Sequence, residues 1–268
     1  WLAMFDQPSL LIVVGASMLI AVVGLIDDVK HVSAYTRLVV QMLVCGAMLA
    51  SIVSVPPFFI FTVGTFDLAT PITITILLFA GVWWINLYNF MDGIDGIAGL
   101  QGLFMMVVSV LVGAFLLETP VNRAEWFWML GLSAAIIGFL ALNWPPAKIF
   151  MGDVGSTYLA FMIYALALLS IKNGWMSYAS WAILGALFVA DTTITLLRRA
   201  HRRELWYQAH RSHAYQRLAR HLKSHRTVML LSFAINLLWL LPLSLVSLLW
   251  ADLAWTFVLV AYAPLVCM

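Results

Sequence analysis

The sequence predicts an all-α integral membrane protein, built as a polytopic helix bundle. Of its 268 residues, 64% are hydrophobic and only 10% are charged, whereas a soluble domain has about 25% charged residues. The apolar residues gather in runs of about 20, which is the length of a helix that crosses a hydrocarbon core of about 30 Å. Helices are expected because lipid offers no partner to an unpaired backbone group. We expect residues 1–268 to form one transmembrane domain.

Nine apolar runs are long enough to be spanning helices. The first carries no charge, and the prolines at 145 and 146 end the fifth. The expected spans are 8–26, 36–54, 71–90, 97–117, 126–143, 155–171, 178–197, 228–248 and 252–268. Two joins are long: residues 55–70, whose alternation suggests a hairpin, and residues 198–227, which are dense in Arg and His.

The basic residues are distributed unevenly between the two sides of this bundle. The side that follows the first span carries Lys30, Arg37, Lys148, Arg198, Arg199, Arg202, Arg203, Arg211, Arg217, Arg220, Lys223 and Arg226, and the other side carries Arg123 and Lys172. Because Lys and Arg accumulate on the cytoplasmic side of membrane proteins, the first of these sides is expected to be cytoplasmic. All six histidines fall on that side too, so we expect the active site at the cytoplasmic face.

Adjacent carboxylates, Asp27 and Asp28, stand at the mouth of the first span. They repel each other and gain nothing from lipid, so a cation or a proton is expected there. Mg²⁺ suits them, because it binds one or two carboxylates together with substrate phosphates. Arg37, at the start of the next span, is suited to a phosphate oxygen. The alternatives are a solvated helix end and an ordinary cytoplasmic anchor.

The third span closes on a polar, glycine-spaced segment, residues 86–99, NLYNFMDGIDGIAG. Asn86 and Asn89 are three residues apart and share a helix face. Asp92 and Asp95 follow between glycines that permit close backbone approach. Such a loop suits contact with a ligand, and the alternative is a tight turn with solvated carboxylates.

A comparable segment follows the fifth span, from Asn143 to Ser156, and contains FMGDVGS at 150–156. Asp153 is framed by glycines, and Ser156 is expected to cap the helix that follows. Phe150 is suited to stacking on a base, although a core or interfacial role is the more common one for a phenylalanine.

The basic join contains HRSH at 210–213, where His210 and His213 would face one way on a helix and flank Arg211. Zinc lacks a third ligand at suitable spacing, so anion binding is favoured. Nucleic-acid binding is not expected for a loop this close to the bilayer. Asp191, inside the seventh span, is a functional candidate because a carboxylate within the membrane is costly; neighbouring threonines could equally satisfy it.

In this order, the Asp pair and the three motifs resemble the polyprenyl-phosphate N-acetylhexosamine-1-phosphate transferases, the WecA/MraY superfamily of glycosyltransferase family 4. The resemblance extends from the first span to the last loop, and the HRSH form is most similar to the WbpL-like branch. The family has ten or eleven spans, which implies that an N-terminal pair precedes this chain. His31 departs from the acid or lysine that many members carry.

The resemblance also implies roles for the matching residues. Asp27 and Asp28 would be catalytic and activate the polyprenyl phosphate. Asn89 and Asp153 would ligate Mg²⁺, with Mn²⁺ as a substitute. The expected nucleotide-binding residues are Asp95, Phe150, Asn143 and Asn86. The phosphates and the sugar would be bound by Arg37, His210, Arg211 and His213. Asp92 and Asp191 would hold these residues in position without contacting the substrate themselves.

The expected reaction transfers HexNAc-1-phosphate from a UDP-N-acetylhexosamine, either GlcNAc or a 6-deoxy sugar, to undecaprenyl phosphate with release of UMP. It would start O-antigen or another envelope polysaccharide in the bacterial inner membrane, and relatives in this family can form homodimers. One alternative is a cation-coupled transporter, whose site would lie nearer the bilayer midplane. The other is a CDP-alcohol phosphatidyltransferase, whose motif has an Arg and further acids that residues 95–99 lack.

Overall fold

The computed structural model describes residues 8–52, 70–116, 124–204 and 212–267. These residues form helices and no strand, so the all-α prediction is confirmed. The helices are α2 (Pro8–Lys30), α3 (Ala34–Ser51), α4 (Thr70–Met91), α5 (Ile97–Leu116), α6 (Ala124–Asn143), α7 (Gly152–Lys172), α8 (Tyr178–Leu184), α9 (Ala186–His201), α10 (Ala214–Leu222), α11 (His225–Ile235), α12 (Leu241–Leu249) and α13 (Ala254–Tyr262). The expected hairpin at 55–70 falls almost wholly outside the described residues.

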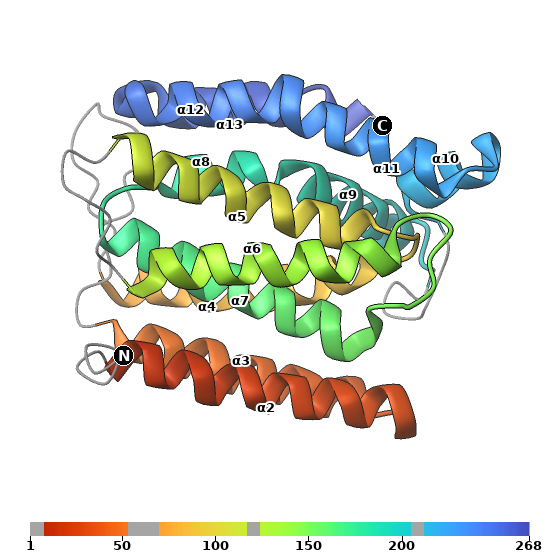
Figure 1. Ribbon diagram of the computed structural model, residues 1–268, viewed down its shortest axis with the longest axis horizontal. Coiled ribbons are helices and arrows are strands. Elements are labelled where there is room, and N and C mark those ends of the chain that lie inside the picture. The colour runs from red at the N-terminus through yellow and green to blue at the C-terminus, as the bar shows by residue number, and fades with distance from the viewer. Residues whose placement is uncertain (1–7, 53–69, 117–123, 205–211, 268) are drawn as a thin grey trace.

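The bundle is built around α5 and α7, which lie in its interior (Figure 1). In each of them, 72% of the most apolar window is buried, against 28–39% in the other five long helices. The helices α2 and α3 form one outer layer, in which α2 packs on α7, while α12 and α13 form the opposite layer on α8. The interior helices are apolar on all sides because they contact other helices, whereas the outer ones present leucines and valines outward, as a lipid-facing surface requires.

Seven helical segments in the described part of the chain are long and apolar enough to cross a membrane. The predicted span 178–197 is divided at Gly185 into α8 and α9, which are bent by 70° and make an eighth span if counted together. The predicted ninth span, 252–268, is not one long helix in the described residues. A 3-10 turn precedes the nine-residue α13, and Pro264 follows it, where a proline prevents the helix from continuing.

The bend between α8 and α9 is held by a polar network inside the bundle. Gln101 of α5 donates a hydrogen bond to the carbonyl oxygen of Leu184 (2.9 Å), directly before the bend. Asn236 donates to Gln101 (2.6 Å) from the start of a π-helical turn, Asn236–Leu240, that joins α11 to α12. The network fixes the direction of α9, which carries Asp191 toward the end of the bundle where the motifs meet.

Candidate active site

The ends of α2 and α4 and the starts of α3, α5 and α7 meet at one end of the bundle (Figure 1). At the crossing of α2 and α7, Gly24 faces the first turn of α7, and a Cβ atom built on it would lie 2.6 Å from the Cα of Val154. Only glycine permits this approach. The crossing therefore brings the C-terminal turn of α2, with both of its carboxylates, against the start of α7.

Asp28 caps α7 from outside that helix. Its carboxylate accepts hydrogen bonds from the backbone N–H groups of Asp153 (2.8 Å) and Val154 (3.1 Å). A carboxylate is stabilising at a helix N-terminus, where N–H groups lack partners within the helix. The prediction that Ser156 caps this helix is wrong, because Ser156 lies inside α7 and donates to the carbonyl of Gly152.

Asp27 is buried, and both of its carboxylate oxygens are engaged. Oδ1 accepts the N–H of Val32 (2.6 Å), and Oδ2 accepts Nη1 of Arg37 (2.7 Å). The same nitrogen of Arg37 lies 3.4 Å from Oδ2 of Asp153. Arg37, at the start of α3, therefore bridges the carboxylates of α2 and α7. Its side chain is 38% exposed, so it remains open to an incoming anion.

Asn89, near the end of α4, joins Asp153 from the other side. Its Nδ2 donates to Oδ1 of Asp153 (2.8 Å) and to Oγ of Ser156 (2.8 Å). Its own oxygen is left without a hydrogen bond among the described residues. Asn86, one turn earlier, does not line this site: it exchanges hydrogen bonds with Gln41 of α3, the shorter at 2.6 Å.

A polar cavity of about 340 Å³ lies beside these residues. It is lined by Asn89, Asp92, Gly93, Ile94, Asp95, Asn143, Phe150, Met151, Gly152, Asp153 and His225. Phe150 is 78% exposed, so its ring face is available to a flat ligand. Burial, together with the negative charge of Asp153, raises the pKa of Asp92 to about 8. The Asp92 carboxyl is therefore mostly protonated at neutral pH, and a cation bound in the cavity would favour its ionised form.

Asn143 and Asp95 connect the two loops that form the cavity wall. Asn143, which is buried, accepts the N–H of Gly96 (2.9 Å) and donates to the carbonyl of Ile149 (2.7 Å). Asp95 accepts the N–H of Ala147 (3.2 Å) and pairs with Nδ1 of His225 (3.3 Å). Sequence reasoning missed His225. Its only signal in the sequence is its position directly after Ser224, the residue that caps α11.

Asp191 supports α10 in the way that Asp28 supports α7. Its carboxylate accepts the N–H groups of Ala214 (2.8 Å) and Tyr215 (3.0 Å), and His213 Nδ1 lies 3.5 Å away. Tyr215 in turn donates from its hydroxyl to the carbonyl of Phe90 at the end of α4 (2.8 Å). His213 is buried and does not line the polar cavity. His210 and Arg211 lie outside the described residues.

The oxygen atoms at this site fit a hard divalent cation in part. The described residues contain no group of three or more His, Cys, Asp or Glu side chains able to hold an ion by themselves. Asp153 and the free oxygen of Asn89 offer the smaller donor set that Mg²⁺ uses when substrate phosphates complete its shell. Mn²⁺ accepts the same oxygen ligands.

The chain resembles known proteins over these same residues. Residues 10–171, which include Asp27, Asp28, Asn89 and Asp153, match the family described as Glycosyl transferase family 4. A probable undecaprenyl-phosphate N-acetylglucosaminyl 1-phosphate transferase of Bacillus subtilis (strain 168) is 30% identical over 266 residues, 95% of this chain and 71% of that protein. A phospho-N-acetylmuramoyl-pentapeptide-transferase of Streptococcus pyogenes serotype M49 is 27% identical over 189 residues, 66% of this chain and 53% of that protein. With the family match covering more than half of its length, the chain belongs to glycosyl transferase family 4.

Proposed function

We propose that this protein transfers N-acetylhexosamine-1-phosphate from a UDP-sugar to a polyprenyl phosphate and releases UMP. The single observation that carries the proposal is the convergence of Asp27, Asp28 and Asp153 with Asn89 and Arg37 beside one polar cavity, at the end of a membrane-spanning bundle. The names of the two relatives support the same class of reaction. We further propose undecaprenyl phosphate as the acceptor and GlcNAc or a 6-deoxy HexNAc as the sugar, for O-antigen or another envelope polysaccharide in the bacterial inner membrane.

In the proposed reaction, an oxygen of the polyprenyl phosphate attacks the β-phosphorus of the UDP-sugar. A new P–O bond forms, the bond to the bridging oxygen breaks, and that oxygen leaves as part of UMP. Phosphoryl transfer depends mainly on positioning and on neutralising charge. Arg37 is suited to hold a phosphate oxygen, because its guanidinium is half-exposed between Asp27 and Asp153.

The hydrogen bonds of the Asp pair favour direct attack over an aspartyl-phosphate intermediate. Both oxygens of Asp27 accept a hydrogen bond, and both oxygens of Asp28 accept backbone N–H groups. These bonds lower the nucleophilicity of both carboxylates, whereas the second lone pair of each oxygen can still accept a proton. We assign Asp28 as the proton acceptor, because it is the exposed member of the pair, and Asp27 as the residue that orients Arg37.

A divalent cation bound by Asp153 and Asn89 would offset the charge of the pyrophosphate and of departing UMP. On the nucleotide side, Phe150 offers a ring face, and Asp95 offers an acceptor oxygen beside it in the cavity. Asn143 acts by holding the two loops of this wall together.

The test is UMP release by the full-length protein, given undecaprenyl phosphate, Mg²⁺ and a panel of UDP-HexNAc donors. Asp153→Asn should abolish turnover and leave the protein folded, whereas the matched change Asp252→Asn, at an exposed turn after α12, should leave the rate unchanged. UMP that requires both lipid and metal would support the proposal, and the fastest donor would identify the sugar. No UMP with any donor from folded protein would overturn the proposed function, and a normal rate in Asp153→Asn would remove Asp153 from the site.

A further inference from the structure

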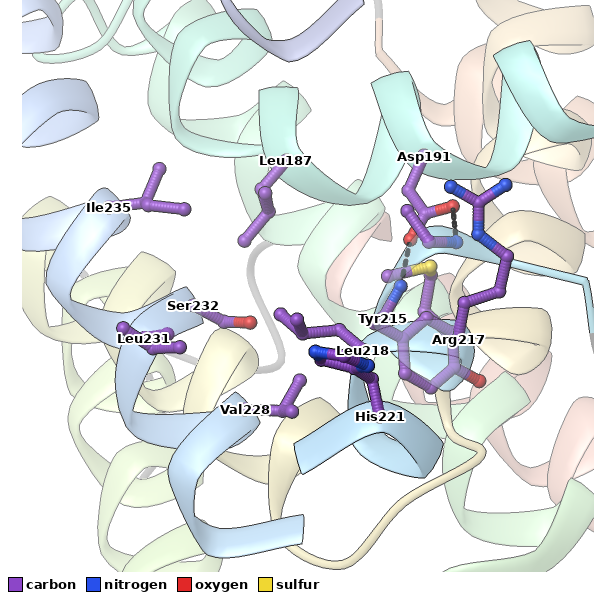
Figure 2. Close-up of a pocket in the computed structure, with 12 residues that line it drawn as sticks. Leu187, Asp191, Tyr215, Arg217, Leu218, His221, Val228, Leu231, Ser232 and Ile235 are labelled. Carbon is purple, nitrogen blue, oxygen red and sulfur yellow. Dashed lines mark hydrogen bonds between the residues drawn. The ribbon is translucent and has the colours of Figure 1, made fainter. Parts of the chain in front are cut away.

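A second cavity, of about 410 Å³, lies between α9, α10 and α11 (Figure 2). It is lined by Met91, Leu187, Asp191, Ala214, Tyr215, Arg217, Leu218, His221, Val228, Leu231, Ser232 and Ile235. None of these residues lines the polar cavity beside the catalytic candidates. The two cavities are separate sites, and the reaction proposed above gives the second no role.

The wall of this cavity that α9 and α11 form is mostly apolar and lies partly exposed on the surface of the bundle. Leu187 of α9 faces Val228, Leu231 and Ile235 of α11 across it (Figure 2). Leu231 is 45% exposed on a helix that begins a membrane span, so the cavity opens on the surface that meets lipid chains. Val228 to Ile235 covers about 10 Å along a helix axis, which lies within the roughly 15 Å of hydrocarbon in one leaflet. This wall therefore suits part of an acyl chain.

The part of the cavity lining that belongs to α10 carries the positive charge of Arg217. Arg217 and His221 are four residues apart, so they lie on one face of that helix. Neither side chain forms an ion pair or a hydrogen bond with any residue that the structure describes. A guanidinium that has no partner in the protein is suited to bind phosphate through paired hydrogen bonds.

Asp191 is the one carboxylate among the residues that line the cavity, and its oxygens are already engaged in hydrogen bonds. Its oxygens accept the N–H groups of Ala214 and Tyr215, drawn as dashed lines in Figure 2, and the hydroxyl of Thr195. The side chain is only 5% exposed. The cavity thus presents the guanidinium of Arg217, with the imidazole of His221 on the same helix, to an incoming ligand.

We propose that this cavity binds an anionic phospholipid, with its phosphate at Arg217 and His221 and part of one acyl chain along α11. The acceptor lipid of the transfer reaction is excluded from this role, because the catalytic candidates Asp28, Arg37 and Asp153 do not line this cavity. Bound lipid would steady α10, which contacts the end of α4 through Tyr215. The proposal does not depend on the sugar or the acceptor of the reaction.

The test measures phosphatidylglycerol bound to the full-length protein, by native mass spectrometry during a lipid titration, with phosphatidylcholine as the neutral comparison. Arg217→Gln should weaken phosphatidylglycerol binding about tenfold, the effect of losing a hydrogen bond to a charged group. Arg226→Gln is the matched control, since it removes the same charge from an exposed position outside the cavity. It should weaken binding by no more than about fivefold, the effect of general attraction to an anionic membrane.

A second variant tests the apolar part without a change of charge. Ser232→Phe should fill the cavity and lower retention of dioleoyl phosphatidylglycerol, while Arg217 remains in place. If Arg217→Gln does not fold, His221→Gln serves in its place. Equal binding by the Arg217 and Arg226 variants would overturn the proposal. Retention of undecaprenyl phosphate, in place of phosphatidylglycerol, that depends on Arg217 would overturn it too.

Discussion

Replacing Asp28 by Ala should lower stability more than replacing it by Asn, although both changes should abolish transfer. Both variants lose the negative charge and the repulsion between Asp28 and Asp153. Only Ala also loses every acceptor for the backbone N–H groups of Asp153 and Val154. Replacing an Asn cap by Ala costs about 1 kcal/mol, which corresponds to a fall of about 2–4 °C in Tm for a chain of this size.

The assay is thermal unfolding in detergent at one fixed scan rate, because unfolding of such proteins is often irreversible. Asp252→Ala, in an exposed turn, is the control and should melt with the parent protein. Identical melting of the Ala and Asn variants of Asp28 would refute the capping role. Unequal activity of the Ala and Asn variants would refute the claim that the negative charge of Asp28 serves the reaction.

Three further changes test the packing and the charge of the site. Asp92→Asn should remove a pH dependence of the protein's stability. Burial raises the pKa of Asp92 to about 8, so between about pH 4 and pH 8 the folded parent binds more protons than the unfolded chain. Within this range the parent loses stability as the pH rises, and above about pH 8 this group causes no further loss. The difference in Tm between the variant and the parent should widen from pH 6 to pH 8 and then stay constant. Asn143→Ala leaves the buried N–H of Gly96 and the partly buried carbonyl of Ile149 without this partner and should cost about 1–3 kcal/mol. The loss should be seen as a lower Tm and weaker UMP binding by calorimetry, and unchanged values would contradict the bridging role. Gly24→Ala forces α2 away from α7 and should cost about 1–3 kcal/mol and most of the activity, whereas Gly15→Ala, on the same helix with no atom within 4 Å, should do neither.

Hydropathy located most of the helices because a spanning helix has to be apolar over its whole length. The first six predicted spans agree with α2 to α7 within a few residues. The pattern failed where composition stays apolar but the backbone changes direction. Neither the bend at Gly185 nor the 3-10 turn before α13 alters hydropathy, so hydropathy alone did not predict the divisions of the seventh and ninth apolar segments.

The motifs indicated which residues meet at one end, but they did not indicate which atoms pair. Asn86 and Asn89 look equivalent on a helix face, yet Asn86 turns to Gln41 and Asn89 turns to Asp153. That difference depends on which neighbour lies beside each residue, and it is decided by helix packing. His225 was missed for the same reason, since its partner Asp95 lies 130 positions earlier in the numbering.

The caps on α7 and α10 also set an order of assembly. An ordinary cap is synthesised together with its helix, but the carboxylate that caps α7 belongs to Asp28, which lies 125 positions before Asp153. Without α2 in place, the first N–H groups of α7 lack partners, so the first turn that carries Asp153 is complete only after the two helices dock. The site is therefore finished by helix association within the bilayer, and faults in that late step would appear as inactive protein with its full helix content.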